Sequence, residues 1–323
     1  MKWQIFTADT FDNYEKQWDD LNFSGPNSPV LNSSFIKHSL KEFGTGKEIL
    51  GTYGNDDSIV AMTVLTKPKF GLWDTFQPSQ APLGFWLNNS GEDTALLLKS
   101  LSKELPGIVL KIGLTQQDPD IYPRPESSNS LSTMDYIDTA RISNNVPFEE
   151  YWAARGKNLR HNLKRQRNRL KKEGIEVCLR VIKEPEKVEQ GIVAYGKLES
   201  AGWKATGGTA IAVDNSQGRF YTALLKDFCC NGQGAIYQYF YNNELVATDL
   251  CIEQGGTLVI LKTTYDESIT TSSPAFLMRQ DAFEQIFSST QVKRIEFYGK
   301  VMEWHTKWSN EIRGLYHLNF KRI

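Results

Sequence analysis

Two aspartates in the carboxy-terminal half of the chain have the chemistry of a proton acceptor. Asp249 lies in the strand-like run 244–253, where alternation places its carboxylate on one face with Leu245, Ala247 and Cys251. A carboxylate among apolar neighbours is unfavourable unless it is paired or functional. Asp266 ends the next predicted strand, 257–266. Both are candidate catalytic bases; the alternatives are a structural ion pair for Asp249 and a loop cap for Asp266.

A third catalytic candidate lies near the carboxyl terminus, in the segment 297–308. His305 is one of four histidines in the chain, and an imidazole can relay a proton near neutral pH. A structural histidine is the alternative. The same segment gathers rings and cations that suit the wall of an acceptor pocket: Tyr298, Lys300, Lys307 and Trp308.

Further acceptor-binding candidates lie outside that tail. Lys204 directly follows Trp203, and an ammonium group at this point suits an acidic acceptor. A lysine stem packed on the indole ring is the alternative. Tyr265, at the end of the strand that precedes Asp266, is also predicted to bind substrate.

A hydroxyl-rich loop, 267–274, opens a predicted helix at 275–287. Ser273 is a plausible N-cap, and Pro274 suits the first helical turn. Free backbone N–H groups and the helix dipole favour an anion there, and a diphosphate would fit. A strand–helix–strand unit without a ligand is the alternative. The predicted cofactor-binding residues are Thr270, Thr271, Ser272, Ser273, Ala275 and Arg279.

A strongly basic helix is predicted over 155–172, with nine Lys or Arg residues and no acidic one. Helical spacing places Leu159, Leu163 and Leu170 on one narrow stripe. Clustered cations can bind tRNA or another polyanion by releasing counterions from its phosphates. The alternative is a solvated helix that docks by its leucines and is neutralised by acidic residues elsewhere.

The elements that position these residues occur twice along the chain. Helical periodicity at 92–104 and 275–287 precedes strand-like runs at 108–114 and 292–299, an arrangement that a parallel crossover requires. A hairpin pattern precedes each helix, at 48–66 and 236–253. We therefore predict an α/β (α+β) chain of two related domains, 1–145 and 146–323, each a mixed sheet flanked by helices.

Composition narrows the class of protein. The 323 residues carry a formal net charge of -1, which gives no global attraction to nucleic acid or to an anionic membrane. Four cysteines lack the spacing of a metal site, so we expect free thiols and no metal. No run approaches the length of a membrane span or a signal sequence, and the expected location is cytoplasmic.

The carboxy-terminal half resembles the GNAT acetyltransferases associated with cellulose and exopolysaccharide synthesis, which are related in architecture to the Fem-type aminoacyltransferases. The resemblance rests on Trp152 with the basic segment 155–174, then on 199–204, 208–211, Phe220-Tyr221, 244–247, 264–266, Ser273-Pro274 and 297–308. Family members often have Gly where this chain has Ala275, and the usual Arg/Gln-x-x-Gly-x-Gly/Ala loop is absent.

The resemblance implies two tandem GNAT-like domains, of which the second holds acyl-CoA, such as acetyl-CoA, between splayed strands. The implied activity is acyl transfer to a primary amine of a small molecule or amino sugar, while the first domain contributes acceptor surface and stability. Two alternatives remain at this stage. One is a Fem-like transferase that uses aminoacyl-tRNA, and the other is a binding module without catalysis.

Overall fold

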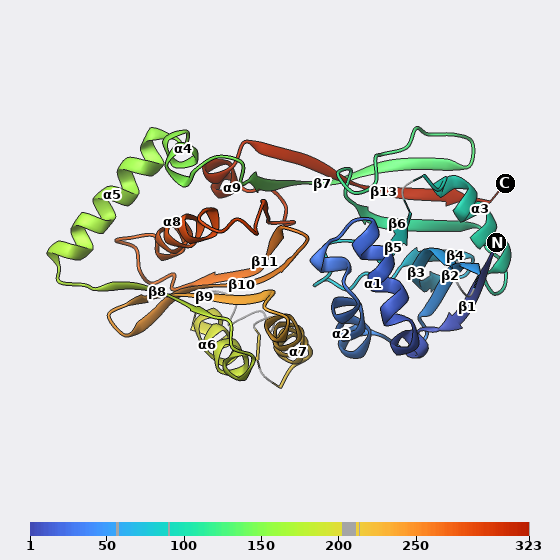
Figure 1. The fold of residues 1–323 in the computed structure, drawn as a ribbon, viewed down its shortest axis with the longest axis horizontal. Helices are drawn as coiled ribbons and strands as arrows, with labels where there is room; N and C mark the ends of the chain where they lie inside the picture. The colour runs from blue at the N-terminus through green and yellow to red at the C-terminus, as the bar shows by residue number, and fades with distance from the viewer. Residues whose placement is uncertain (56–57, 90, 202–210, 213, 323) are drawn as a thin grey trace. The chain divides into compact units, whose positions relative to one another are not determined.

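The computed structural model describes residues 1–55, 58–89, 91–201, 211–212 and 214–322. These residues form two compact units, each a mixed β-sheet with helices packed on it (Figure 1). The first unit takes residues 1–139, the short segment 299–301 and the chain from Ile312 onward; the second takes 140–298 and 302–311. The chain thus passes from the first unit to the second after residue 139, and from Ile312 onward it belongs to the first unit again. The domain bounds 1–145 and 146–323 stay a prediction.

The sheet of the first unit surrounds one parallel pair of strands. Its order is β1 (Lys2–Thr7), β2 (Ile49–Asn55), β3 (Ser58–Lys69), β4 (Leu72–Thr75), β6 (Lys111–Gln117) and β13 (Glu311–Lys321), with β5 (Trp86–Asn88) beside β3. Strands β4 and β6 run parallel, joined by helix α3 (Thr94–Glu104), whereas β1 to β4 pair antiparallel. Helices α1 (Glu15–Ser24) and α2 (Ser33–Phe43) and the 3-10 segments Ala8–Tyr14 and Pro29–Leu31 complete the unit.

Helix α3 is held by its leucines and by a capped first turn. Leu97, Leu98 and Leu101 are buried in the core of the first unit, and the Trp3 indole N–H donates to the Leu97 carbonyl at 3.0 Å. Asp93 accepts hydrogen bonds from the backbone N–H groups of Ala95 and Leu96, which no helical carbonyl can satisfy.

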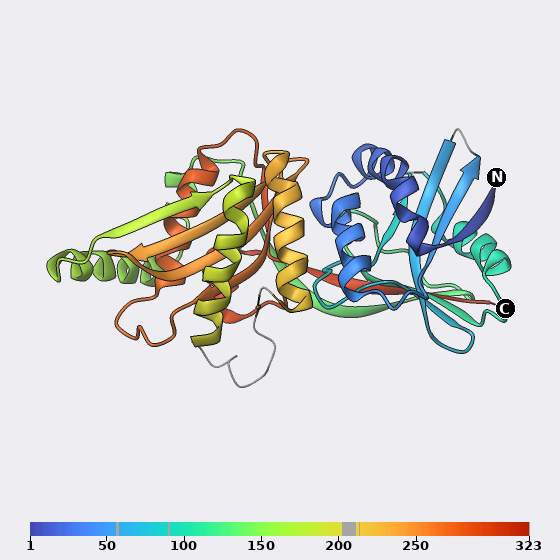
Figure 2. The ribbon, with the colours of Figure 1, turned by 90° about the horizontal axis from the view of Figure 1, so that it is seen from below.

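The sheet of the second unit has helices on both faces (Figure 2). Its order begins with the end of β7 (Leu131–Ser143), of which residues 140–143 belong to this unit. The order continues with β12 (Arg294–Glu296), β11 (Thr257–Tyr265), β10 (Glu244–Gln254), β9 (Gly234–Tyr241) and β8 (Val177–Ile182). Helices α6 (Val188–Ala201) and α7 (Ser216–Cys230) cover one face, and α8 (Pro274–Phe287) covers the other. The 3-10 segment Pro185–Lys187 precedes α6. The predicted meander β9–β10–β11 and the predicted parallel crossover β11–α8–β12 are confirmed.

Three further helices complete the second unit: α4 (Phe148–Ala153), α5 (Lys157–Lys172) and α9 (Glu303–Trp308). The predicted leucine stripe of α5 is buried, and Arg167 ties α5 to α8 by donating to Gln280, to Asp281 and to the Leu277 carbonyl. Within the described chain, no helix combines the length and the apolar character needed to cross a bilayer. The four cysteines are free thiols; Cys229 and Cys251 are buried, whereas Cys230 is exposed.

Candidate functional site

Strands β11 and β12 separate after a short parallel ladder. Pairing ends at Val259 opposite Glu296, the last residue of β12, whereas β11 continues to Tyr265. A β-bulge at Leu261 follows directly, because the partners on β10 skip this residue. In the described ladders, residues 260–265 therefore pair with β10 alone. An open strand edge of this kind can hydrogen-bond to an extended ligand that carries amide groups.

A buried charge pair lies on the face of the sheet that α8 covers. Asp249 on β10 and Arg279 on α8 are each 3% exposed, and Arg279 Nη2 is 3.9 Å from Asp249 Oδ1. Thr263 on β11 joins them: its Oγ1 accepts from Arg279 Nη2 at 2.9 Å, and it hydrogen-bonds to Asp249. Among the described residues, Asp249 Oδ1 and Arg279 Nε have no hydrogen-bond partner.

Burial shifts the pKa values of both members of this pair. Burial raises the pKa of Asp249, and the nearby Arg279 cation and the Thr263 hydrogen bond only partly offset this. Burial also lowers the pKa of Arg279. Buried polar atoms are almost always hydrogen-bonded, so two unpaired atoms in one charged cluster indicate a place for a ligand or for reacting atoms.

Aromatic rings of α9 and of the chain after β12 enclose Arg279. Its guanidinium lies 4.2 Å from the Trp304 ring centroid and 6.0 Å from that of Phe297. His305 stacks on Trp304 with ring centroids 3.5 Å apart, and its Nδ1 accepts from the Met302 N–H at 2.9 Å. Burial, and then the charge of Arg279, lower the pKa of His305 to about 4. A pKa of about 4 makes this imidazole a weaker base than an ordinary histidine, and its role as a proton relay stays a prediction.

Asp266 caps its own loop. Its Oδ1 accepts from the Ser268 N–H at 2.9 Å and from the Ser268 hydroxyl at 2.6 Å, while its backbone N–H donates to the Val246 carbonyl at 2.8 Å. This geometry matches the loop-cap alternative. Of the two aspartates, Asp249 is therefore the stronger candidate for a base.

In the loop before α8 and at the start of this helix, some side chains are buried and others are exposed. Thr270 and Thr271 are exposed, Ala275 is buried, and Ser272 Oγ lies 2.8 Å from Tyr241 Oη. Ser273 is the N-cap residue, but its side chain makes no capping bond. Its backbone N–H donates to Gln166 Oε1 of α5 at 2.9 Å. Lys307 Nζ of α9 lies 6.0 Å from the ring centroid of Phe276 in the first turn of α8.

A pocket of about 590 Å³ opens between the start of α8, helix α5 and helix α9. Residues of α8 (Ser273 and Phe276) line it on one side, and residues of α9 such as Thr306 and Lys307 on another. Lys307 forms a salt bridge to Glu303 at 3.1 Å. The α5 wall consists of Asn158, Leu159, Asn162, Leu163 and Gln166.

The remaining predicted acceptor residues fall in different places. Trp203 and Lys204 lie outside the described residues. Tyr265 is 43% exposed at the open end of β11, and Lys300 and Lys307 are exposed. Tyr298 is buried with a φ of 50°, and Trp308 is fully buried in contact with Phe283, so Trp308 belongs to the core and not to a pocket wall.

Sequence reasoning missed three residues of this site: Thr263, Gln166 and Trp304. Thr263 could be found only from strand register, because it is the cross-strand partner of Asp249. Gln166 lies within the basic helix, where the positive charges dominate the pattern. Trp304 was part of the predicted tail segment, but nothing in the sequence links it to Arg279.

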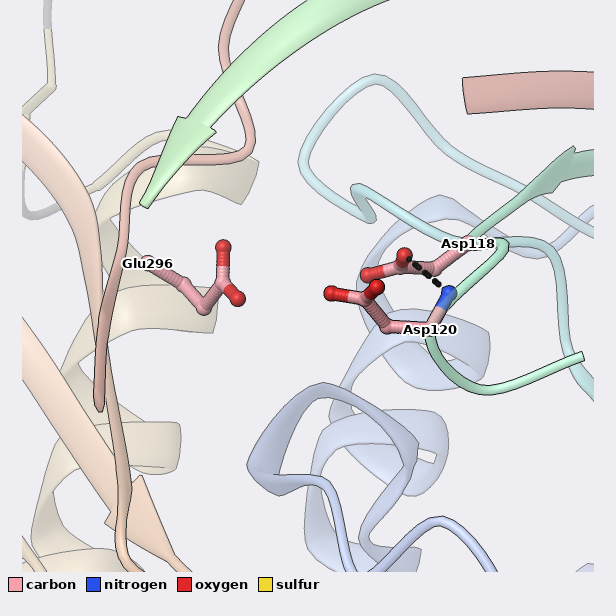
Figure 3. Close-up of side chains that lie close together, drawn as sticks. All are labelled: Asp118, Asp120 and Glu296. Carbon is pink, nitrogen blue, oxygen red and sulfur yellow. Dashed lines mark hydrogen bonds between the residues drawn. The ribbon is translucent and has the colours of Figure 1, made fainter. Parts of the chain in front are cut away.

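Acidic residues of the first unit form a separate ion network. In Figure 3, the Asp120 N–H donates to Asp118 Oδ1 at 3.0 Å. Arg313 of the same unit donates through Nε to Asp118 Oδ1 at 2.8 Å and lies 3.2 Å from Asp120 Oδ2. Glu296, also labelled there, ends β12 of the second unit, with Arg294 Nη1 3.6 Å from its Oε1. Each unit thus supplies an arginine to its own carboxylates.

Residues 157–306 match the family model of the acetyltransferase (GNAT) domain, and this match lies largely within the second unit. Solved structures resemble the chain over both units. FemX has a TM-score of 0.60 at 9% identity, covering 100% of this chain and 98% of its own. A Bacteroides thetaiotaomicron protein of unknown function has a TM-score of 0.59 at 10% sequence identity, and the match covers 99% of each chain. L-PGS from Bacillus licheniformis has a TM-score of 0.55 at 11% sequence identity, and the match covers 95% of this chain and 91% of L-PGS.

These likenesses confirm the predicted α/β fold with its mixed sheet and flanking helices, and at such low identity they concern the fold alone. None of the curated proteins matches the chain in sequence. The side chains of this chain are therefore the evidence for the chemistry of the site.

The lowered pKa of His305 predicts how stability depends on pH. The folded pKa is about 4 and the ordinary value 6.5, so below pH 6.5 the unfolded chain binds a proton that the folded chain does not. The wild type should lose about 2–3 kcal/mol more stability than His305→Gln as the pH falls from 6.5 to 4. Urea unfolding of both proteins across this range measures the difference; parallel curves would show that His305 titrates normally.

Proposed function

We propose that the second unit transfers an acyl group, such as acetyl, from a coenzyme A thioester to a primary amine of a small molecule or amino sugar. The observation that carries this proposal is the early separation of β11 from β12, directly beside the buried Asp249–Arg279 pair. The GNAT family match over 157–306 supports the same reaction class.

The donor is proposed to bind in two parts. Its diphosphate lies at the start of α8, where Ser273 makes no side-chain capping bond and the helix dipole favours an anion. The Phe276 and Leu277 N–H groups donate to the Ser273 carbonyl, so the Ala275 N–H is the first-turn group proposed to face the phosphate. Its pantetheine arm extends along the open edge of β11 and offers its amides to the backbone of residues 260–265. The thioester then reaches the region of Thr263 and Arg279.

The first unit offers an internal comparison. Its corresponding crossover, β4–α3–β6, has Asp93 at the helix start, and this carboxylate already accepts from two first-turn N–H groups. A negative charge at that point repels a phosphate, so donor binding is assigned to the second unit. The first unit is proposed to contribute acceptor surface and stability.

The reaction requires proton transfer and stabilisation of an oxyanion, without a covalent enzyme intermediate. The amine nitrogen forms a bond to the thioester carbonyl carbon, and the carbonyl electrons move to oxygen near the Arg279 cation. The ammonium proton passes to the Asp249 carboxylate. When the C–S bond breaks, the thiolate leaves and takes up this proton, giving the amide and free coenzyme A.

A carboxylate placed at the start of α8 should abolish donor binding. In Ser273→Asp, the new side chain would cap the helix as Asp93 caps α3 and would repel the diphosphate. We expect coenzyme A to bind at least about tenfold more weakly, with melting temperature unchanged or raised. Ser273→Asn provides a neutral cap and should bind nearly as the wild type. Calorimetric titration measures the affinity of the wild type and the two variants for coenzyme A. Equal affinities would show that the diphosphate does not bind at this helix start.

Replacing the proposed base should affect turnover more than donor binding. Asp249→Asn should lower kcat roughly 100- to 10,000-fold while the Kd for coenzyme A stays within a few-fold. Wild-type kcat should fall with decreasing pH at a pH above the ordinary aspartate value of 3.8, because burial raises the pKa of Asp249 and the base acts when deprotonated.

Asp266→Asn is the matched control, because this carboxylate caps a loop, and its kcat should stay within a few-fold of the wild type. A thermal melt of Asp249→Asn shows whether the variant is folded at the assay temperature. Full turnover by folded Asp249→Asn would contradict the assignment, and a wild type without turnover on any acyl-CoA and amine pair would favour a binding module.

A second candidate function follows from the cationic side of α5. Lys157, Arg160 and Lys164 line a groove of about 510 Å³ with Trp152. Of the nine basic residues at 155–172, Arg167 and Arg169 form salt bridges to carboxylates, and the structure gives no such partner for the other seven within its described residues. Such a surface suits a Fem-like transferase that takes its aminoacyl group from tRNA.

This candidate predicts salt-sensitive binding of aminoacyl-tRNA. The triple change Lys157→Glu, Arg160→Glu and Lys164→Glu should abolish binding, and single changes to Ala should each lower the slope of log K against log salt by about one. Arg167 is left intact because it anchors α5 to Asp281. Exposed lysines of the first unit, Lys41, Lys99 and Lys103, serve as a charge-matched control. If both triple variants bind alike, α5 has no specific role in binding RNA.

A further inference from the structure

Helix α5 presents two chemically different sides. Asn158, Asn162 and Gln166 are spaced four residues apart, so their carboxamides form a row along one side, and all three line the pocket beside α8. The cations Lys157, Arg160 and Lys164 line the groove on the other side. The pocket beside α8 is thus lined by three amides of α5, and the groove by three of its cations, while Arg165 and Arg169 follow the same helical face as the amides.

We infer that this carboxamide row reads the adenine base of the donor nucleotide. The inference rests on the proposed function, because it takes the diphosphate to lie at the start of α8. The chemical class of ligand is an adenosine nucleotide with phosphates at its ribose, which coenzyme A and the 3′ end of an aminoacyl-tRNA both contain.

The direction of the ligand supports this assignment. A diphosphate at Ser273 has two arms, and the arm that carries the thioester must run toward the open edge of β11. The nucleoside arm then leaves on the side away from the sheet, where the pocket of about 590 Å³ lies between α5 and α9. This volume lies within the range of ordinary ligand pockets.

The pocket wall has the groups that adenine recognition requires. A carboxamide offers a donor and an acceptor side by side, which pair with the N6 amino group and the adjacent ring nitrogen of adenine, whereas guanine reverses this pattern at O6. Asn158 and Asn162 are exposed and make no side-chain hydrogen bond within the described chain. Gln166 completes the row, and its Oε1 accepts from the Ser273 N–H at 2.9 Å. Phe276 adds a half-buried ring for stacking.

The test compares two nucleotides that differ only in the base. Calorimetric titration of the full chain with adenosine 3′,5′-bisphosphate and guanosine 3′,5′-bisphosphate should give roughly tenfold tighter binding of the adenosine form. Asn158→Ala with Asn162→Ala should remove the preference. Asn168→Ala, a carboxamide in the cationic groove of the same helix, should retain it. Equal binding of the two bases by the wild type, or an unchanged preference in the double variant, overturns the inference.

Two further ligands separate this inference from the proposed function. If coenzyme A binds and is lost in Ser273→Asp while the bases are not distinguished, the proposed function stands and adenine reading fails. If an RNA hairpin ending in CCA binds through Asn158 and Asn162 but coenzyme A does not, adenine reading stands and the donor is aminoacyl-tRNA. If no adenosine ligand binds, both proposals fail.

Discussion

The arrangement of the second unit depends on the buried contact between Asp249 and Arg279. Two charges withdrawn from water are strongly unfavourable unless they lie together with supporting hydrogen bonds. Arg279 must therefore lie over β10 with Thr263 beside it and Trp304 across its guanidinium. This requirement fixes the rotation of α8 on the sheet and places its first turn beside the end of β11, where β12 has already stopped.

Both units contain a parallel strand–helix–strand crossover, but its side chains differ between them. In the first, β4 and β6 are joined beyond their ladder by Thr75 and Thr115, whose hydroxyl oxygens are 2.7 Å apart, and Asp93 satisfies the start of α3. These contacts close the strand gap and occupy the helix start with a carboxylate. In the second unit, the corresponding helix start lacks a side-chain cap and the strand edge is open. The two units thus differ in a few side chains at the helix start and along the strand edge.

The local patterns in the sequence predicted most of the fold. Alternation and tight turns gave the meander β9–β10–β11, and helical spacing followed by a strand gave both parallel crossovers, because these features depend on neighbours along the chain. Asp249 and Arg279 were identified as candidates for separate reasons, yet their contact joins β10 to α8 and could not be deduced from spacing. His305 illustrates the same limit, since its lowered pKa depends on burial and on Arg279, which the sequence does not place beside it.

Helix α5 explains how a donor site can be completed by an element outside the sheet. The start of α8 supplies backbone N–H groups but little side-chain surface, so a bound nucleotide needs a further wall. Buried leucines dock α5 against its unit, which leaves three of its carboxamides along the pocket and Lys157, Arg160 and Lys164 along the groove. Because Gln166 already accepts from the Ser273 N–H, a phosphate that binds there must displace one neutral amide oxygen. That exchange removes no charge from the site, and so the helix start remains favourable for an anion.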